Sequence, residues 1–198
     1  MKAAKRAAAL ASVAVLVLVL GVLTASEPPR VVFSLFAAIA LHEGGHVVAI
    51  KAAGLPLTGV IPLPFGAMLD TGARICPYPT EAAVYLAGPM ASLAGAAVAA
   101  LGADAQKTNV AFCFAILSAG LGCFNLLPLP GLDGAGALRS LLLYTMPDMY
   151  AAERAARVVE AVFSLLFWLA AGAVWLAFDT GAYPLALSVF FLLRLLCG

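Results

Sequence analysis

Two histidines and a glutamate lie close together in residues 42–46, His-Glu-Gly-Gly-His, and the chain has no other histidine. On an α-helix, His42 and His46 are one turn apart on the same face, so both imidazoles could bind one zinc ion. Glu43 lies beside them, where its carboxylate could activate a water molecule. The alternative is that the histidines only pack against their neighbours. We favour the zinc site, because ionisable residues in an apolar segment are costly and a membrane helix gains nothing from this set.

A second polar site lies in residues 125–134, Asn-Leu-Leu-Pro-Leu-Pro-Gly-Leu-Asp-Gly. The prolines and glycines must break the apolar helix that precedes them. Broken backbone at membrane depth is tolerated only where it lines a cavity or is buried in protein. A catalytic zinc takes three protein ligands and keeps a fourth position for water, which predicts Asp133 as the third ligand. The alternative is an ordinary turn with a solvated aspartate.

The composition predicts the setting of these residues. The 198-residue chain is 64% hydrophobic and 11% charged, and its mean hydropathy is +1.06. These values are typical of a polytopic, all-α membrane protein surrounded by the lipid bilayer. The net charge of +1 gives no basic footprint, so we expect no nucleic-acid partner. No Cys-x-x-Cys pair occurs among the four cysteines, which we expect to pack rather than to form disulfides or bind metal.

About six membrane spans follow from the apolar runs, with the histidine motif in the middle of the second. The fourth is predicted to be broken at the Asp133 segment. The first could instead be a cleaved signal peptide, but its length and the spans that follow favour an uncleaved helix. The predicted spans are residues 7–25, 31–53, 80–101, 108–134, 153–178 and 183–196.

Residues 57–79, after the second span, contain too much proline and glycine for a helix. Val60–Phe65 suits an extended edge strand, in which Pro62 and Pro64 would share one edge without N–H donors. The opposite edge would keep its donors free to pair, at Ile61, Leu63 and Phe65. The alternative is an irregular loop. In the third span, small residues at 88, 92 and 95 or 96 predict close helix packing.

Basic residues predict the orientation. With six spans and a cytoplasmic N-terminus, nine of the eleven lysines and arginines lie inside, and Arg30 and Lys107 lie outside. This bias predicts a multi-pass protein of the cell membrane. It also places the 54–79 segment and the Asp133 side of the site toward the cytoplasm.

Three motifs occur in order: residues 42–46, then Gly88-Pro89-Met90-Ala91-Ser92, then residues 125–134. Together they resemble the site-2 protease family of intramembrane zinc metalloproteases. The likeness covers about residues 31–144, and the six spans look most like the branch that includes the sporulation protease, which cleaves a membrane-tethered pro-sigma factor. Ser92 stands where many relatives have asparagine.

The resemblance implies one membrane metalloprotease domain over residues 1–198, with a catalytic core of about 31–144 and no soluble regulatory domain. It implies one zinc ion per chain, bound by His42, His46 and Asp133, with Glu43 as the general base. Asn125 would position the substrate or stabilise the developing oxyanion. The substrate would be a membrane-anchored protein cleaved in or near its transmembrane segment, and unwound substrate would pair with strands of the 57–79 segment. Regulation by a membrane partner is open.

Other functions compete with this one. A membrane zinc transporter also places histidine and acidic residues in membrane helices, but it usually needs a second set of ligands, and no third histidine exists. A catalytically inactive scaffold is disfavoured because Glu43 and all three expected ligands are present. A membrane peptidase that acts on soluble substrates remains a further alternative.

Overall fold

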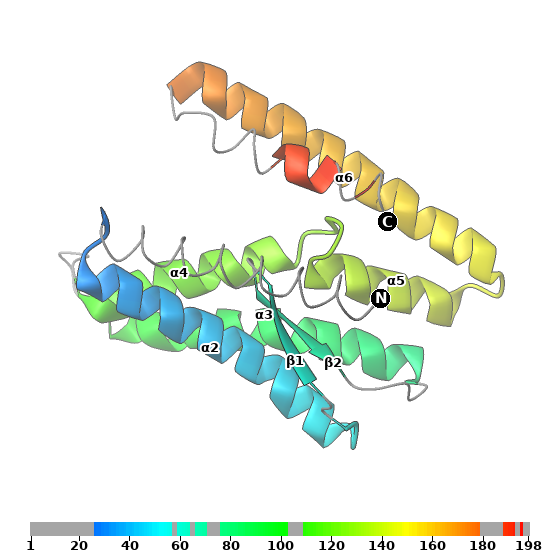
Figure 1. The fold of residues 1–198 in the computed structure, drawn as a ribbon, viewed down its shortest axis with the longest axis horizontal. Helices are drawn as coiled ribbons and strands as arrows, with labels where there is room; N and C mark the ends of the chain where they lie inside the picture. The colour runs from blue at the N-terminus through cyan, green and yellow to red at the C-terminus, as the bar shows by residue number, and fades with distance from the viewer. Residues whose placement is uncertain are drawn as a thin grey trace, which may run out of the picture. The chain divides into compact units, whose positions relative to one another are not determined.

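The computed structural model describes residues 26–56, 59–63, 66–70, 76–102, 109–178, 188–192 and 195 (Figure 1). The first predicted span, and most of the sixth, lie outside these residues. The described residues belong to two units, one formed by Met1–Ile75 with Ala87–Cys123 and the other by Cys76–Leu86 with Phe124–Gly198. The elements are α2 (Pro29–Ala52), β1 (Gly59–Leu63), β2 (Gly66–Asp70), α3 (Tyr78–Leu101), α4 (Val110–Asn125), α5 (Asp133–Thr145) and α6 (Met149–Phe178).

Within these ranges, α2, α3 and α6 are long and apolar enough to cross a membrane, judged by length and composition, and α4 is a shorter apolar helix. A 24-residue helix such as α3 is about 36 Å long, enough for a hydrocarbon core of about 30 Å. Large apolar side chains are exposed on these helices, among them Val48, Val98 and Leu176. Such apolar surfaces are favourable in contact with lipid and unfavourable in contact with water.

Proline and glycine set the ends of α2. Pro29 begins the helix, at a position where the missing N–H would have no helical partner. After Ala52 the chain turns through Gly54, whose φ of +67° lies in the left-handed region that glycine adopts without strain. The N–H of Leu55 then donates to the carbonyl of Ile50 at 3.0 Å. The helix therefore ends where its sequence predicts.

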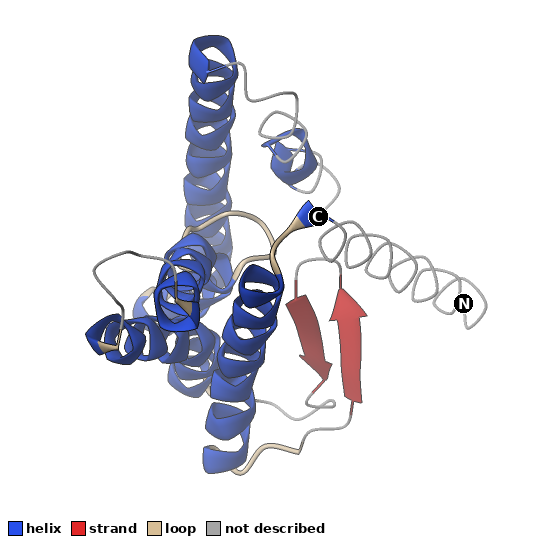
Figure 2. Cartoon of the chain, turned by 90° about the vertical axis from the view of Figure 1, so that its left-hand side faces the viewer, coloured by secondary structure: helices blue, strands red, loops and turns tan. Residues whose placement is uncertain are grey.

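The segment after α2 forms an antiparallel hairpin, drawn in red in Figure 2, in which Leu63 pairs with Gly66 and Val60 with Leu69. β1 covers most of the predicted strand. Because Pro62 has no N–H to give to the ladder, the N–H groups of its neighbours Ile61 and Leu63 point to β2. The prediction that this donor edge stays free is therefore wrong, since the chain's own second strand occupies it.

The outer edge of β2 is the one that offers donors. Strand alternation directs the N–H groups of Ala67 and Leu69 away from β1. In the part of the chain that the structure describes, the sheet has two strands, and β2 contacts α2.

Small residues bring α2, α3 and α4 of the first unit close together. A Cβ added to Gly95 would collide with the side chain of Leu41, and one added to Gly122 would lie 3.0 Å from the carbonyl oxygen of Pro89. The hydroxyl of Ser34 also donates to the carbonyl of Val110 at 3.2 Å, which links α2 to α4. Small residues and interhelical hydrogen bonds are the usual means of packing helices in lipid.

In the second unit, α5 and α6 lie against each other and share an ion pair. Nε of Arg139 donates to both carboxylate oxygens of Glu153 at 3.0 Å. Ser140 donates to Glu81, at the start of α3, at 3.0 Å. The ring of Tyr85 packs against Gly136 so closely that a Cβ there would collide with it. α3 thus contacts α2 with one part of its length and α5 with another.

Candidate metal centre

α2 presents two imidazoles on one face, as the spacing of the motif predicts. His42 and His46 are buried, at 5% and 7% exposure, and their ring centroids are 5.1 Å apart. Glu43 follows His42 directly, and one of its carboxylate oxygens is shielded from solvent. A buried pair of imidazoles beside a carboxylate is expensive to build into an apolar segment unless it binds something.

His46 lies against the backbone of α3 at Gly88. A Cβ at position 88 would collide with the His46 ring, at Nε2, Cε1 and Cδ2. Glycine at this position is therefore what lets the ring occupy its site. The sequence predicts Gly88 only as a packing residue, and the structure shows that the group it packs against is one of the two histidines.

Ser92, one turn further along α3, contacts the other histidine. Its hydroxyl oxygen lies 3.0 Å from Nδ1 of His42, and Ser92 itself is fully buried. The sequence signal at this position is a small residue in a packing motif, which gives no indication of a hydrogen bond to a histidine.

Asp133 is the first residue of α5, after a stretch of non-helical backbone from 126 to 132. Two features fix this stretch: Gly131 has a φ of +87°, and Leu129 is 1% exposed. Gly134 is packed against the backbone, because a Cβ there would collide with the carbonyl groups of Leu126 and Leu127. The proline- and glycine-rich sequence thus ends one helix and places Asp133 at the start of the next.

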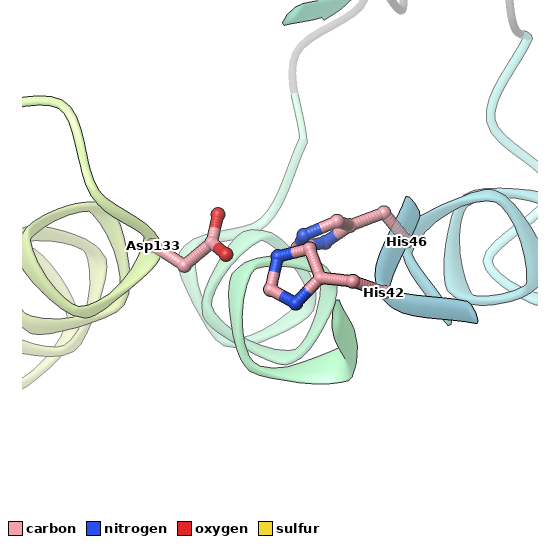
Figure 3. Close-up of side chains that lie close together, drawn as sticks. All are labelled: His42, His46 and Asp133. Atoms are coloured by element: carbon pink, nitrogen blue, oxygen red, sulfur yellow. The ribbon is translucent and has the colours of Figure 1, made fainter. Parts of the chain in front are cut away.

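His42, His46 and Asp133 each offer a ligand atom, and these atoms all lie within 4.8 Å of one another (Figure 3). The two histidines are buried and the aspartate is partly exposed. Two imidazoles and one carboxylate make a donor set that zinc accepts at catalytic sites, with one position left for water. The residues present therefore fit a bound metal ion.

Asn125 is the last residue of α4 and is buried, at 9% exposure. It lies eight residues before Asp133, at the point where the helix breaks. Its predicted contact with substrate stays a prediction.

The sequence is similar to those of proteins named zinc metalloproteases. It is 32% identical over 162 residues to a protein of Mycobacterium tuberculosis named putative zinc metalloprotease Rip3, a match that covers 73% of this chain and 41% of that protein. It is 29% identical over 144 residues to zinc metalloprotease MJ0392 of Methanocaldococcus jannaschii, covering 68% of this chain and 41% of that protein. The chain thus spans less than half the length of these relatives. No family model matches it.

The fold also has a known counterpart. The structure matches the site-2 protease from Methanocaldococcus jannaschii with a TM-score of 0.63, over 95% of this chain and 87% of the other. Identity in this match is 20%, so it shows a shared fold. The chain thus has the fold of a site-2 protease and a sequence similar to those of proteins named zinc metalloproteases.

Proposed function

We propose that this protein is an intramembrane zinc metalloendopeptidase that hydrolyses a peptide bond in or near the transmembrane segment of a membrane-anchored protein. The single observation that carries this proposal is the clustering of ligand atoms from His42, His46 and Asp133 within 4.8 Å. The names of the relatives support zinc as the metal and proteolysis as the reaction.

In the proposed site, His42, His46 and Asp133 hold one zinc ion, which when bound supplies Lewis acidity to a water molecule and to the scissile carbonyl. Glu43 accepts the proton of the attacking water and returns it to the departing amine. Asn125 donates a hydrogen bond to the substrate or to the developing oxyanion.

A peptide in a helix hides its carbonyl groups in hydrogen bonds, so the substrate must unwind before attack. The hairpin offers a partner for the unwound segment, which pairs with the outer edge of β2 through Ala67 and Leu69. The contact of β2 with α2, the helix of both histidines, supports this strand as the one that the substrate uses.

The membrane arrangement that we propose has six spans, with the fourth interrupted between α4 and α5. The N-terminus, the hairpin and the approach to Asp133 lie on the cytoplasmic side, as the distribution of basic residues predicts. A membrane-tethered pro-sigma factor is one substrate that fits this arrangement.

Metal analysis of the purified chain tests the proposal. We expect about one zinc per wild-type chain and near-complete loss in the double variant His46→Ala, Asp133→Ala, because one histidine cannot hold the ion alone. Asp148→Ala is the matched control, since Asp148 is exposed in the connection between α5 and α6. Full zinc retention in the double variant would contradict the assignment, and zinc uptake by proteoliposomes without proteolysis would favour a transporter.

A further inference from the structure

Ser92 and His42 meet at the contact between α3 and α2. The serine hydroxyl oxygen lies 3.0 Å from Nδ1 of the imidazole, and the contact is buried. A histidine that binds a metal ion does so through one ring nitrogen, and the hydrogen bond of the other nitrogen decides which one. With Nδ1 facing the hydroxyl, Nε2 is the nitrogen of His42 that remains for a metal ion.

α4 holds Ser92 in place from its other side. The hydroxyl of Ser118 donates to the backbone carbonyl of Ser92 at 2.9 Å, and Ser118 is also fully buried. A Cβ added to Gly122 would lie 3.1 Å from the Cβ of Ser92, so the two helices are in close contact at this point. These contacts hold the backbone and the Cβ of Ser92, from which the hydroxyl reaches the imidazole.

We propose that Ser92 is a positioning residue, which accepts the Nδ1–H of His42 and so fixes the tautomer and the orientation of the metal-binding ring. This inference rests on the proposed zinc site. Outer-shell partners of metal-binding histidines typically contribute about 10- to 100-fold to metal affinity. The competing interpretation is the one that the sequence predicts, in which Ser92 is only a small residue that lets helices approach.

The first experiment measures zinc affinity by competition with a chelator in the full-length chain. We expect Ser92→Ala to weaken binding about 10- to 100-fold, and Ser92→Thr, which keeps the hydroxyl on the same carbon, to recover most of it. Ser164→Ala is the matched control, because Ser164 is a fully buried serine of α6 and should leave the affinity unchanged. The visible spectrum of bound Co²⁺ should change in Ser92→Ala and not in the control.

The second experiment needs no substitution at Ser92, so it holds even where Ser92→Ala fails to fold. The chain has only two histidines, and the ¹⁵N spectrum of the histidine-labelled, metal-free protein at pH 8.5 is therefore simple. With His46→Ala assigning the remaining signals, His42 should show the Nδ1–H tautomer. The Nε2–H tautomer would overturn the inference.

The outcomes separate this inference from the proposed function. If His42→Ala loses zinc while Ser92→Ala keeps the wild-type zinc affinity and cobalt spectrum, Ser92 is only a packing residue. The positioning role of Ser92 is then rejected, and the proposed zinc site is retained. If His42→Ala keeps its zinc, the proposed metal centre falls and the role of Ser92 falls with it.

Discussion

In the proposed mechanism, Glu43 is the residue whose chemistry distinguishes a protease from a membrane protein that only binds zinc. It follows the buried His42 on α2, three residues before the buried His46, and one of its oxygens is shielded from solvent. The spacing of His42, Glu43 and His46 could be predicted from sequence because it depends only on the geometry of one helix. The Ser92–His42 contact could not, because it depends on how two helices are rotated against each other.

We therefore predict that Glu43→Gln keeps the zinc and loses cleavage. Glutamine has nearly the same size but cannot take a proton from water, and general acid–base catalysis typically contributes about 100- to 10,000-fold. Zinc content and cleavage of a single-span substrate should be measured on the same preparation. Glu27→Gln is the matched control, because Glu27 is exposed before α2. Wild-type rates in a zinc-replete Glu43→Gln variant would rule out the mechanism.

Among the elements, the hairpin departs most clearly from what its sequence predicts. The prolines of 60–65 locate an edge strand correctly, since the missing N–H groups restrict where such a strand can pair. The partner strand, Gly66–Asp70, has the sequence Gly-Ala-Met-Leu-Asp, which has little β-propensity. The local sequence therefore does not predict a strand there. The pairing of β1 with β2, and not β-propensity, therefore determines that the outer edge of β2 is the one that offers donors to a further strand.

The outer edge of β2, which pairs with no strand among the residues that the structure describes, gives a matched pair of substitutions. Leu69→Pro removes an outward N–H from β2, whereas Val60→Pro, at the register partner on β1, changes the edge that already contains Pro62. Both leave the hydrogen bonds of the ladder intact. If substrate pairs with β2, Leu69→Pro should lower kcat/KM by about 3- to 10-fold, the value of one hydrogen bond, and Val60→Pro should have little effect. Equal effects of the two substitutions would argue against this docking edge.

For the whole molecule, α3 supplies a test of orientation because its two ends should lie on opposite sides of the membrane. Cys76 precedes α3 by two residues and Gly102 follows it directly. A Cβ at Gly102 would meet its nearest neighbours at ordinary contact distances, 3.7 and 3.9 Å, so a cysteine fits there. The sequence predicts the span itself from hydropathy alone, whereas its direction depends on charge bias over the entire chain.

Cys76 and Gly102→Cys, each as the sole cysteine, should react with a membrane-impermeant maleimide from opposite sides, Cys76 from the cytoplasm. Burial, and then the Glu81 carboxylate, raise the pKa of the Cys76 thiol. The reactive thiolate is therefore scarcer than usual near neutral pH, and labelling of Cys76 should accelerate as the pH rises toward that pKa. The assay is best run above pH 8. Labelling of both positions from one side would refute a membrane-spanning α3.

Gly88 performs no chemistry, yet its contact with the ring of His46 leaves its position no freedom to vary. Even the methyl group of alanine would occupy space that the imidazole fills, whereas at Gly120 an added Cβ meets nothing within 4 Å. In a library selected for proteolysis, position 88 should retain glycine alone, and position 120 should accept alanine. A histidine on one helix thus restricts which residue another helix can carry. A substitution at position 88 would displace the His46 ring and inactivate the site, although no metal-binding or catalytic residue has been replaced.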